Sequence, residues 1–175
     1  MPDLMSEALA ADLEGDFHEA TRNYELEIER DGSCEDAFVN LSFIYWYLAF
    51  SPPPTLRAGV SDTWSTRAGD RYADVIEQGM KKYPESLELA FWKRYFSYRS
   101  AGDPFSESDC CDLIAKYPKS ETFVPYFFLY LFDRSNYEKQ ASILRQECEQ
   151  LPTTKNKYIK SILSTNSCRE GRSKV

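Results

Sequence analysis

The feature of this sequence that most constrains its fold is a proline-centred pattern that recurs every 34 residues. Its three copies read Lys-Tyr-Pro-Glu-Ser, Lys-Tyr-Pro-Lys-Ser and Gln-Leu-Pro-Thr-Thr, and they are centred on Pro84, Pro118 and Pro152. A proline cannot continue a helix, and a hydroxyl side chain two residues later can accept a hydrogen bond from the free amides of the next helix. We therefore predict a helix end, a tight turn and a helix start at each copy, which is typical of stacked helical repeats.

The segments between these copies have the periodicity of helices. Leu89, Trp92 and Phe96 recur at spacings of three and four residues, which places them on one face of a helix. Helix breakers and a further apolar stripe follow in each unit, so second helices are expected over about 105–117 and about 136–150. Each unit is thus predicted to be two antiparallel helices joined by a short turn.

The amino-terminal half has the same design and carries a family resemblance. A turn at Gly15 is followed by Ala20 and Tyr24 on one helical face, and the next helix is expected to carry the core residues Phe38, Leu41, Ser42 and Tyr45. With the 34-residue period, this pattern resembles the tetratricopeptide-repeat family. The resemblance implies an all-α fold, a right-handed α-α superhelix of about four antiparallel helix pairs with a carboxy-terminal capping helix.

One insertion interrupts the period. The distance from Gly32 to Pro84 is 52 residues, 18 more than one period of 34. These extra residues fit an irregular, proline-rich insertion at 51–67. Trp64 in this insertion either folds back onto the helices or is offered to a partner, and we favour folding back because an exposed tryptophan is costly.

The chain is expected to form a single domain. We predict one helical-repeat domain over residues 1–165, in which a capping helix near 155–164 closes the last pair. Residues 166–175 are expected to be a basic, flexible tail.

The resemblance also implies a function, because the first helix of each pair lines the concave wall in this family. The positions expected on that wall are mostly aromatic, with one guanidinium, and such side chains are enriched at binding hot spots. They predict a protein or peptide partner in the concave groove, bound through Val39, Phe43, Trp46, Tyr47, Arg94, Tyr98, Phe128 and Phe132. The alternative is that about half of them pack between helices, Phe128 and Phe132 first. On the binding interpretation, replacing Trp46 and Tyr47 together weakens capture of the partner without unfolding the chain.

The charge pattern suggests what kind of partner to expect. The net charge is −7, and residues 1–50 carry twelve acids against two arginines, a net −10. This acidic region favours a basic partner. An immunity protein, antitoxin or secretion chaperone that neutralises a partner protein is one alternative. RNA binding through the basic carboxy-terminal end, with six bases and one acid in 154–175, is a further alternative, although nucleic acid is not the expected partner.

Catalytic chemistry has little support in the sequence. The chain has one histidine, His18, in a predicted turn where we expect a surface residue, and its five cysteines include no Cys-x-x-Cys pair. No nucleotide-binding glycine motif is present. We therefore expect no enzyme activity, no cofactor and no metal site. The sequence has neither a signal peptide nor an apolar stretch long enough for a membrane span, so a cytoplasmic protein is expected.

Overall fold

The structure, a computed structural model, describes residues 3–50 and 62–165. These residues form helices joined by short turns, and no strand occurs among them. The helices are α1 (Leu4–Glu14), α2 (Phe17–Ile28), α3 (Glu35–Phe50), α5 (Asp62–Lys82), α6 (Leu87–Ser100), α7 (Glu107–Lys116), α8 (Tyr126–Leu129), α9 (Arg134–Gln150) and α10 (Thr154–Thr165). The predicted all-α class is confirmed for this part of the chain. Most of the predicted insertion and the predicted tail lie outside the described residues.

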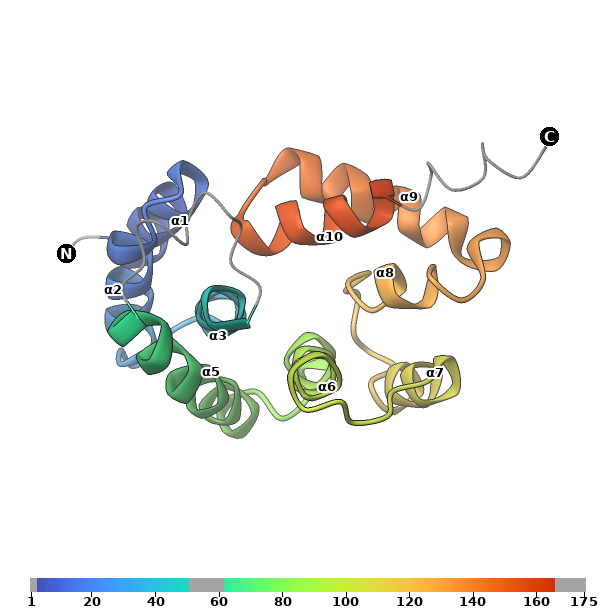
Figure 1. Cartoon of the computed structure of the whole chain (residues 1–175), viewed down its shortest axis with the longest axis horizontal. Helices are drawn as coiled ribbons and strands as arrows, with labels where there is room; N and C mark the ends of the chain where they lie inside the picture. The colour runs from blue at the N-terminus through green and yellow to red at the C-terminus, as the bar shows by residue number, and fades with distance from the viewer. Residues whose placement is uncertain (1–2, 51–61, 166–175) are drawn as a thin grey trace.

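The helices pack in consecutive pairs, and each pair contacts the next. The pairs are α1 with α2, α3 with α5, α6 with α7 and α8 with α9, followed by α10. Figure 1 shows that the chain follows a curved path from α1 to α8, that α9 runs back toward α1, and that α10 then runs beside α9 in the opposite direction. Because α10 contacts α3, α8 and α9, the last helix closes the array from the inside. None of the described helices is long and apolar enough to cross a membrane.

Two element boundaries differ from the sequence prediction. Helix α5 begins at Asp62, so the segment expected to be irregular through residue 67 is helical over its last residues. Helix α8 has only four residues and begins at Tyr126, although a helix start was predicted at the turn of Pro118. Pro125 is the N-cap of α8, and since proline has no amide hydrogen it cannot join a helix that starts earlier.

The predicted hydroxyl caps are realised at one of the three proline turns. Ser86 Oγ accepts a hydrogen bond of 3.0 Å from the Leu89 amide at the start of α6. No helix begins directly after Ser120, because the next one starts at Tyr126. At the third turn Thr154 is the first residue of α10, and its amide donates to a distant carboxylate described below.

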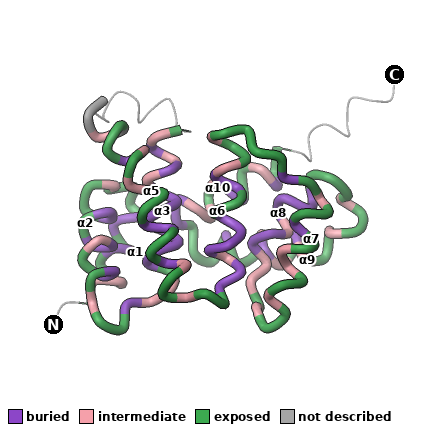
Figure 2. The backbone as a smooth tube through the Cα atoms, turned by 90° about the horizontal axis from the view of Figure 1, so that it is seen from below, coloured by how far each residue is buried: buried purple, intermediate pink, exposed green. Residues whose placement is uncertain are grey.

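The core is a continuous cluster of aromatic rings that links the pairs. Trp92 on α6 lies 4.9 Å from the Phe43 ring of α3 and 5.7 Å from the Phe127 ring of α8, measured between ring centroids. Trp46 stacks on Phe96 at 5.1 Å. Figure 2 shows that buried segments are concentrated in α3, α6 and α8, the helices that line the inside of the array. Burial of this large apolar area is the main force that holds the pairs together.

Alanine substitutions at two glycines of α5 are expected to change the free energy of unfolding in opposite directions. A Cβ atom at Gly79 would lie 2.9 Å from Phe38 Cβ and 3.0 Å from a methyl carbon of Leu89, whereas one at Gly69 would meet only Ala49 Cβ at 3.7 Å. We expect Gly79→Ala to lower the free energy of unfolding by about 1–3 kcal/mol through overpacking. Gly69→Ala is expected to raise it by about 0.5–1 kcal/mol, because alanine is the better helix former. Urea denaturation followed by circular dichroism measures both changes. If both variants change the free energy of unfolding in the same direction, the close approach of α5 to α3 and α6 is contradicted.

Candidate protein-binding surface

A helix of the same chain covers part of the surface that the sequence predicts to be the inner wall. Tyr158 of α10 packs against the rings of Phe43 and Trp46 at centroid distances of 5.3 and 5.7 Å. Its hydroxyl lies 2.7 Å from the hydroxyl of Tyr95 on α6. Helix α10 therefore lies in the trough formed by α3, α6 and α8, which we call the helical trough.

Four of the eight predicted binding residues, Val39, Phe43, Trp46 and Phe128, are inside the protein, each at most 1% exposed. Tyr158 of α10 covers Phe43 and Trp46. Phe128 is instead enclosed by neighbouring rings, and it stacks on Phe105 at 4.6 Å. Tyr47 is half-buried and its ring lies 6.1 Å from that of Tyr158. These positions fit the alternative that about half of the set packs between helices.

The other predicted residues are Arg94 in the middle of α6, Tyr98 near its carboxyl end and Phe132 after α8. Arg94 is exposed, donates a 2.8 Å hydrogen bond to the Pro104 carbonyl oxygen and lies over the Phe105 ring. Tyr98 and Phe132 are 37% and 50% exposed. The expectation that Phe132 is among the first to pack between helices is wrong, because α8 ends at Leu129 and Phe132 follows in an exposed turn.

Tyr98, Phe132 and the neighbouring Leu131 form an exposed apolar surface that we call the aromatic edge. The rings of Tyr98 and Phe132 both pack against buried Phe128, at 5.6 and 5.1 Å. Leu131 is 43% exposed and lines a cavity of about 380 Å³ beside the edge. The cavity is lined by Tyr95, Arg99, Leu131, Tyr158, Ser161, Ile162 and Thr165. Sequence reasoning missed Leu131, although the run from Phe127 to Phe132 has more apolar residues than one buried helical face can hold.

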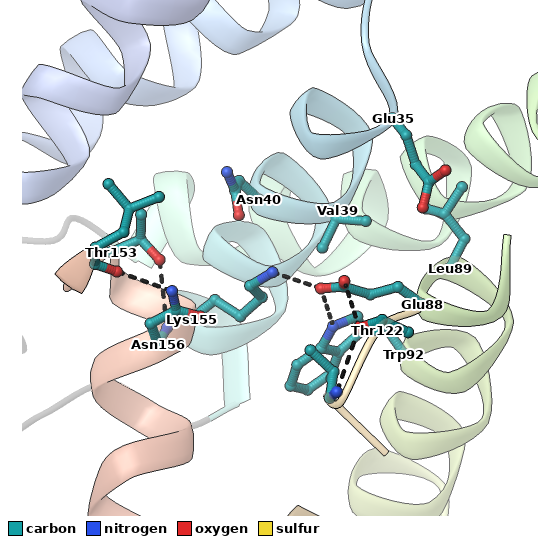
Figure 3. Close-up of polar contacts among 12 residues, drawn as sticks. Glu35, Val39, Asn40, Glu88, Leu89, Trp92, Thr122, Thr153, Lys155 and Asn156 are labelled. Carbon is teal, nitrogen blue, oxygen red and sulfur yellow. Dashed lines mark hydrogen bonds and ion pairs between the residues drawn. The ribbon is translucent and has the colours of Figure 1, made fainter. Parts of the chain in front are cut away.

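A group of carboxylates at the other end of the trough holds α10 by a lysine. Lys155 pairs with Glu88, and both side chains are nearly buried, at 11% and 13% exposure. Figure 3 shows that the same carboxylate accepts hydrogen bonds from Thr122 Oγ1 at 3.1 Å and from Trp92 Nε1 at 3.4 Å. Burial lowers the pKa of the Lys155 ammonium, but attraction to Glu88 outweighs it, so the pKa is raised overall.

Three further acids act on this pair electrostatically. We call them, together with Glu88, the carboxylate socket: Glu35, Asp36, Glu88 and Glu147. Burial raises the pKa of Glu35 and of Glu147, and repulsion by Glu88 raises both further. Only Glu88 contacts Lys155, and the other three acids act on the pair through their charge, so the socket favours a cation.

A second acid anchors the first residue of α10. Asp12 of α1 is 1% exposed, and its Oδ1 accepts hydrogen bonds from the Thr154 amide at 2.9 Å and the Thr154 hydroxyl at 2.6 Å. Asp12 Oδ2 is buried without a hydrogen-bond partner, and burial raises the pKa of this carboxyl group. The first and last described helices are therefore joined directly.

A cavity of about 520 Å³ lies between α2, α3 and α5. Arg71 there donates two hydrogen bonds to Glu25, at 2.9 and 2.7 Å, and Tyr45 donates a third.

The positions of His18 and Trp64 agree with the sequence predictions. His18 is exposed, and Trp64 is half-buried, with its ring centroid 4.6 Å from that of His18. Trp64 therefore folds back onto the helices. Within residues 3–50 and 62–165 no three acidic, histidine or cysteine side chains are grouped so as to hold a metal ion.

Fold and site define the class of this protein: an all-helical array of paired helices with an occupied inner trough and an exposed aromatic edge. Comparison of the chain with protein families, with curated proteins and with solved structures found no match.

Proposed function

We propose that this chain is a non-enzymatic interaction scaffold, a right-handed superhelix of tetratricopeptide-like pairs, that binds a partner protein through the aromatic edge. The observation that carries the proposal is the exposure of Tyr98 and Phe132, whose rings both pack on Phe128, and of Leu131 beside a cavity. Contiguous exposed apolar side chains mark interaction sites in proteins whose remaining surface is polar.

The edge has the properties of a preformed binding surface. Phe128 is 1% exposed and supports the rings of both Tyr98 and Phe132, which limits their motion before a partner arrives. Rigid aromatic anchors supply contact area at a small cost in side-chain entropy. The 380 Å³ cavity beside Leu131 has room for one large apolar side chain of the partner, and Arg99 in its wall can pair with a carboxylate.

Charge at the opposite end of the chain favours a basic partner. The first fifty residues carry a net charge of −10, and they include α1, α2 and α3. A negative field of this kind speeds the encounter with a positively charged protein and weakens as salt is added. The expected partner is therefore a basic protein that presents an apolar side chain to the edge.

Affinity capture from the native host, followed by titration of the purified captured protein, tests this proposal. We expect Leu131→Ser/Phe132→Ser to weaken the affinity for that protein by at least about tenfold, because exposed anchors of this kind dominate binding energies. The fold is expected to be retained, since both side chains are about half exposed.

Leu26→Ser is the matched control, because Leu26 on α2 is 42% exposed but lies far along the chain from the edge. It is expected to leave the affinity unchanged. Equal affinities of the edge variant, the control and the wild-type chain for the captured protein would overturn the proposal.

A further inference from the structure

Helix α10 lies in the helical trough as a bound helix would. Lys155, Tyr158 and Ile162 follow one another at spacings of three and four residues and meet α6 at successive levels. Lys155 pairs with Glu88 near the start of α6, Tyr158 meets Tyr95 in its middle, and Ile162 lines the cavity with Arg99 near its end. Anchors at positions i, i+3 and i+7 are the pattern by which an amphipathic helix occupies a groove on another protein.

The charges of the trough and of α10 are complementary. Helix α10 carries three lysines and no acid, whereas the carboxylate socket brings four acids to one end of the trough. A buried ion pair contributes little net stability, because desolvation offsets most of the attraction, but it rejects helices that lack the cation. The socket therefore selects a helix with a lysine three residues before an aromatic side chain.

The attachment of α10 to the rest of the chain allows such a helix to leave. A short turn, residues 151–153, with proline in its middle, joins α10 to α9. At the start of the helix Thr154 donates two hydrogen bonds to Asp12, whose other oxygen has no hydrogen-bond partner. Exchange of α10 for a helix with the same anchors replaces the contacts of those three residues by equivalent ones. The tether and the buried side chains Ile159 and Leu163 favour the resident helix.

We propose that the helical trough is a second protein-binding site, that α10 is its resident ligand, and that a partner's basic amphipathic helix with the spacing Lys-x-x-aromatic binds in place of α10. This site shares the cavity lined by Leu131 and Ile162 with the aromatic edge, but its other anchors, Glu88 and Tyr95, are not part of the edge. The tether gives α10 an effective concentration of about 1 mM, so the partner helix has to bind more tightly than an untethered copy of α10.

A fluorescent peptide with the sequence of residues 151–165, titrated into the full chain, tests the proposal. Lys155→Ala/Tyr158→Ala in the chain weakens the resident helix and leaves the trough intact. We expect this variant to bind the peptide at least about tenfold more tightly than the wild-type chain does, because a larger fraction of its troughs is open. Lys160→Ala is the control and leaves the affinity unchanged, since Lys160 is 46% exposed and pairs with Glu149 on α9.

The remaining outcomes decide the identity of the occupant. A peptide with glutamate in place of the first lysine is expected not to bind, and equal binding would overturn the role of the socket. Dimers of the wild-type chain formed by exchange of α10, detected by light scattering, would make a second copy the occupant and overturn the proposal.

If the double variant does not fold, hydrogen exchange of the wild-type chain decides whether α10 is released. Amides of α10 are expected to exchange at least about tenfold faster than those of α3 and α6, and equal protection would exclude release of α10.

Discussion

Replacing Trp46 by alanine is expected to lower the free energy of unfolding by about 3–5 kcal/mol, the range found for large aromatic side chains in cores. Trp46 is 1% exposed, stacks on Phe96 at 5.1 Å and touches Tyr158 of α10 at 5.7 Å. Its indole Nε1 donates a 2.7 Å hydrogen bond to Ser100 Oγ, so truncation also leaves that hydroxyl without its donor. Chemical denaturation monitored by circular dichroism measures the change.

The control is Phe50→Ala on the same helix. Phe50 is 51% exposed and contacts Tyr72 at one edge, so its removal is expected to cost less than about 1 kcal/mol. Similar losses for the two variants would mean that α6 and α10 do not close over α3. The burial of Trp46 also revises what the sequence suggested, namely that replacing Trp46 and Tyr47 together leaves the fold intact.

Helix pairing could be predicted from the sequence because its signals are local. Gly15 adopts a positive φ of 79°, and Ser86 caps α6 within three residues of its own position. Glycine and capping hydroxyls act on their immediate neighbours, so these two signals could be recognised without knowledge of distant contacts. The hydroxyl of Thr154 shows the limit, because it donates to Asp12 and does not cap its own helix. The predicted helix boundary was wrong at α8, which starts after Pro125 and has only one turn.

The place of α10 could not be predicted, because it depends on contacts between distant residues. The hydrogen bonds from Thr154 to Asp12 span 142 residues, and no local pattern announces them. A signal was present on α10 itself. Ile159 and Leu163 are fully buried, while Tyr158 is half-buried in the trough, so the helix has apolar side chains on two faces. A helix that merely caps an array needs only one apolar face.

The same limit explains the candidate binding residues. The periodicity of α3 identifies which side chains share a face, but an apolar face can be covered by another helix or by a partner. Phe43 and Tyr98 were equivalent on this criterion, and only the course of α10 separates them. It covers Phe43, whereas Tyr98 packs against Phe105 and Phe128 and stays 37% exposed.

Removing one member of the buried pair between Lys155 and Glu88 is the second change with a large expected effect. Lys155→Met leaves the Glu88 carboxylate almost enclosed without its cation, and losses of about 3–5 kcal/mol in the free energy of unfolding are typical of this situation. Adding Glu88→Gln removes the remaining charge while keeping an oxygen that can accept from Thr122. The double variant is therefore expected to be more stable than Lys155→Met alone, and the double-mutant cycle gives the coupling energy.

The exposed ion pair of Lys93 with Glu77 is the control for this experiment. Both of its side chains are 48% exposed, so Lys93→Met is expected to change the free energy of unfolding by less than about 1 kcal/mol. Salt is expected to reduce the small effect at Lys93 further and to leave the effect at Lys155 nearly unchanged, because water and ions do not reach a buried pair. Equal losses at the two lysines would show that the socket does not hold α10, and the trough would then be closed by its aromatic contacts alone.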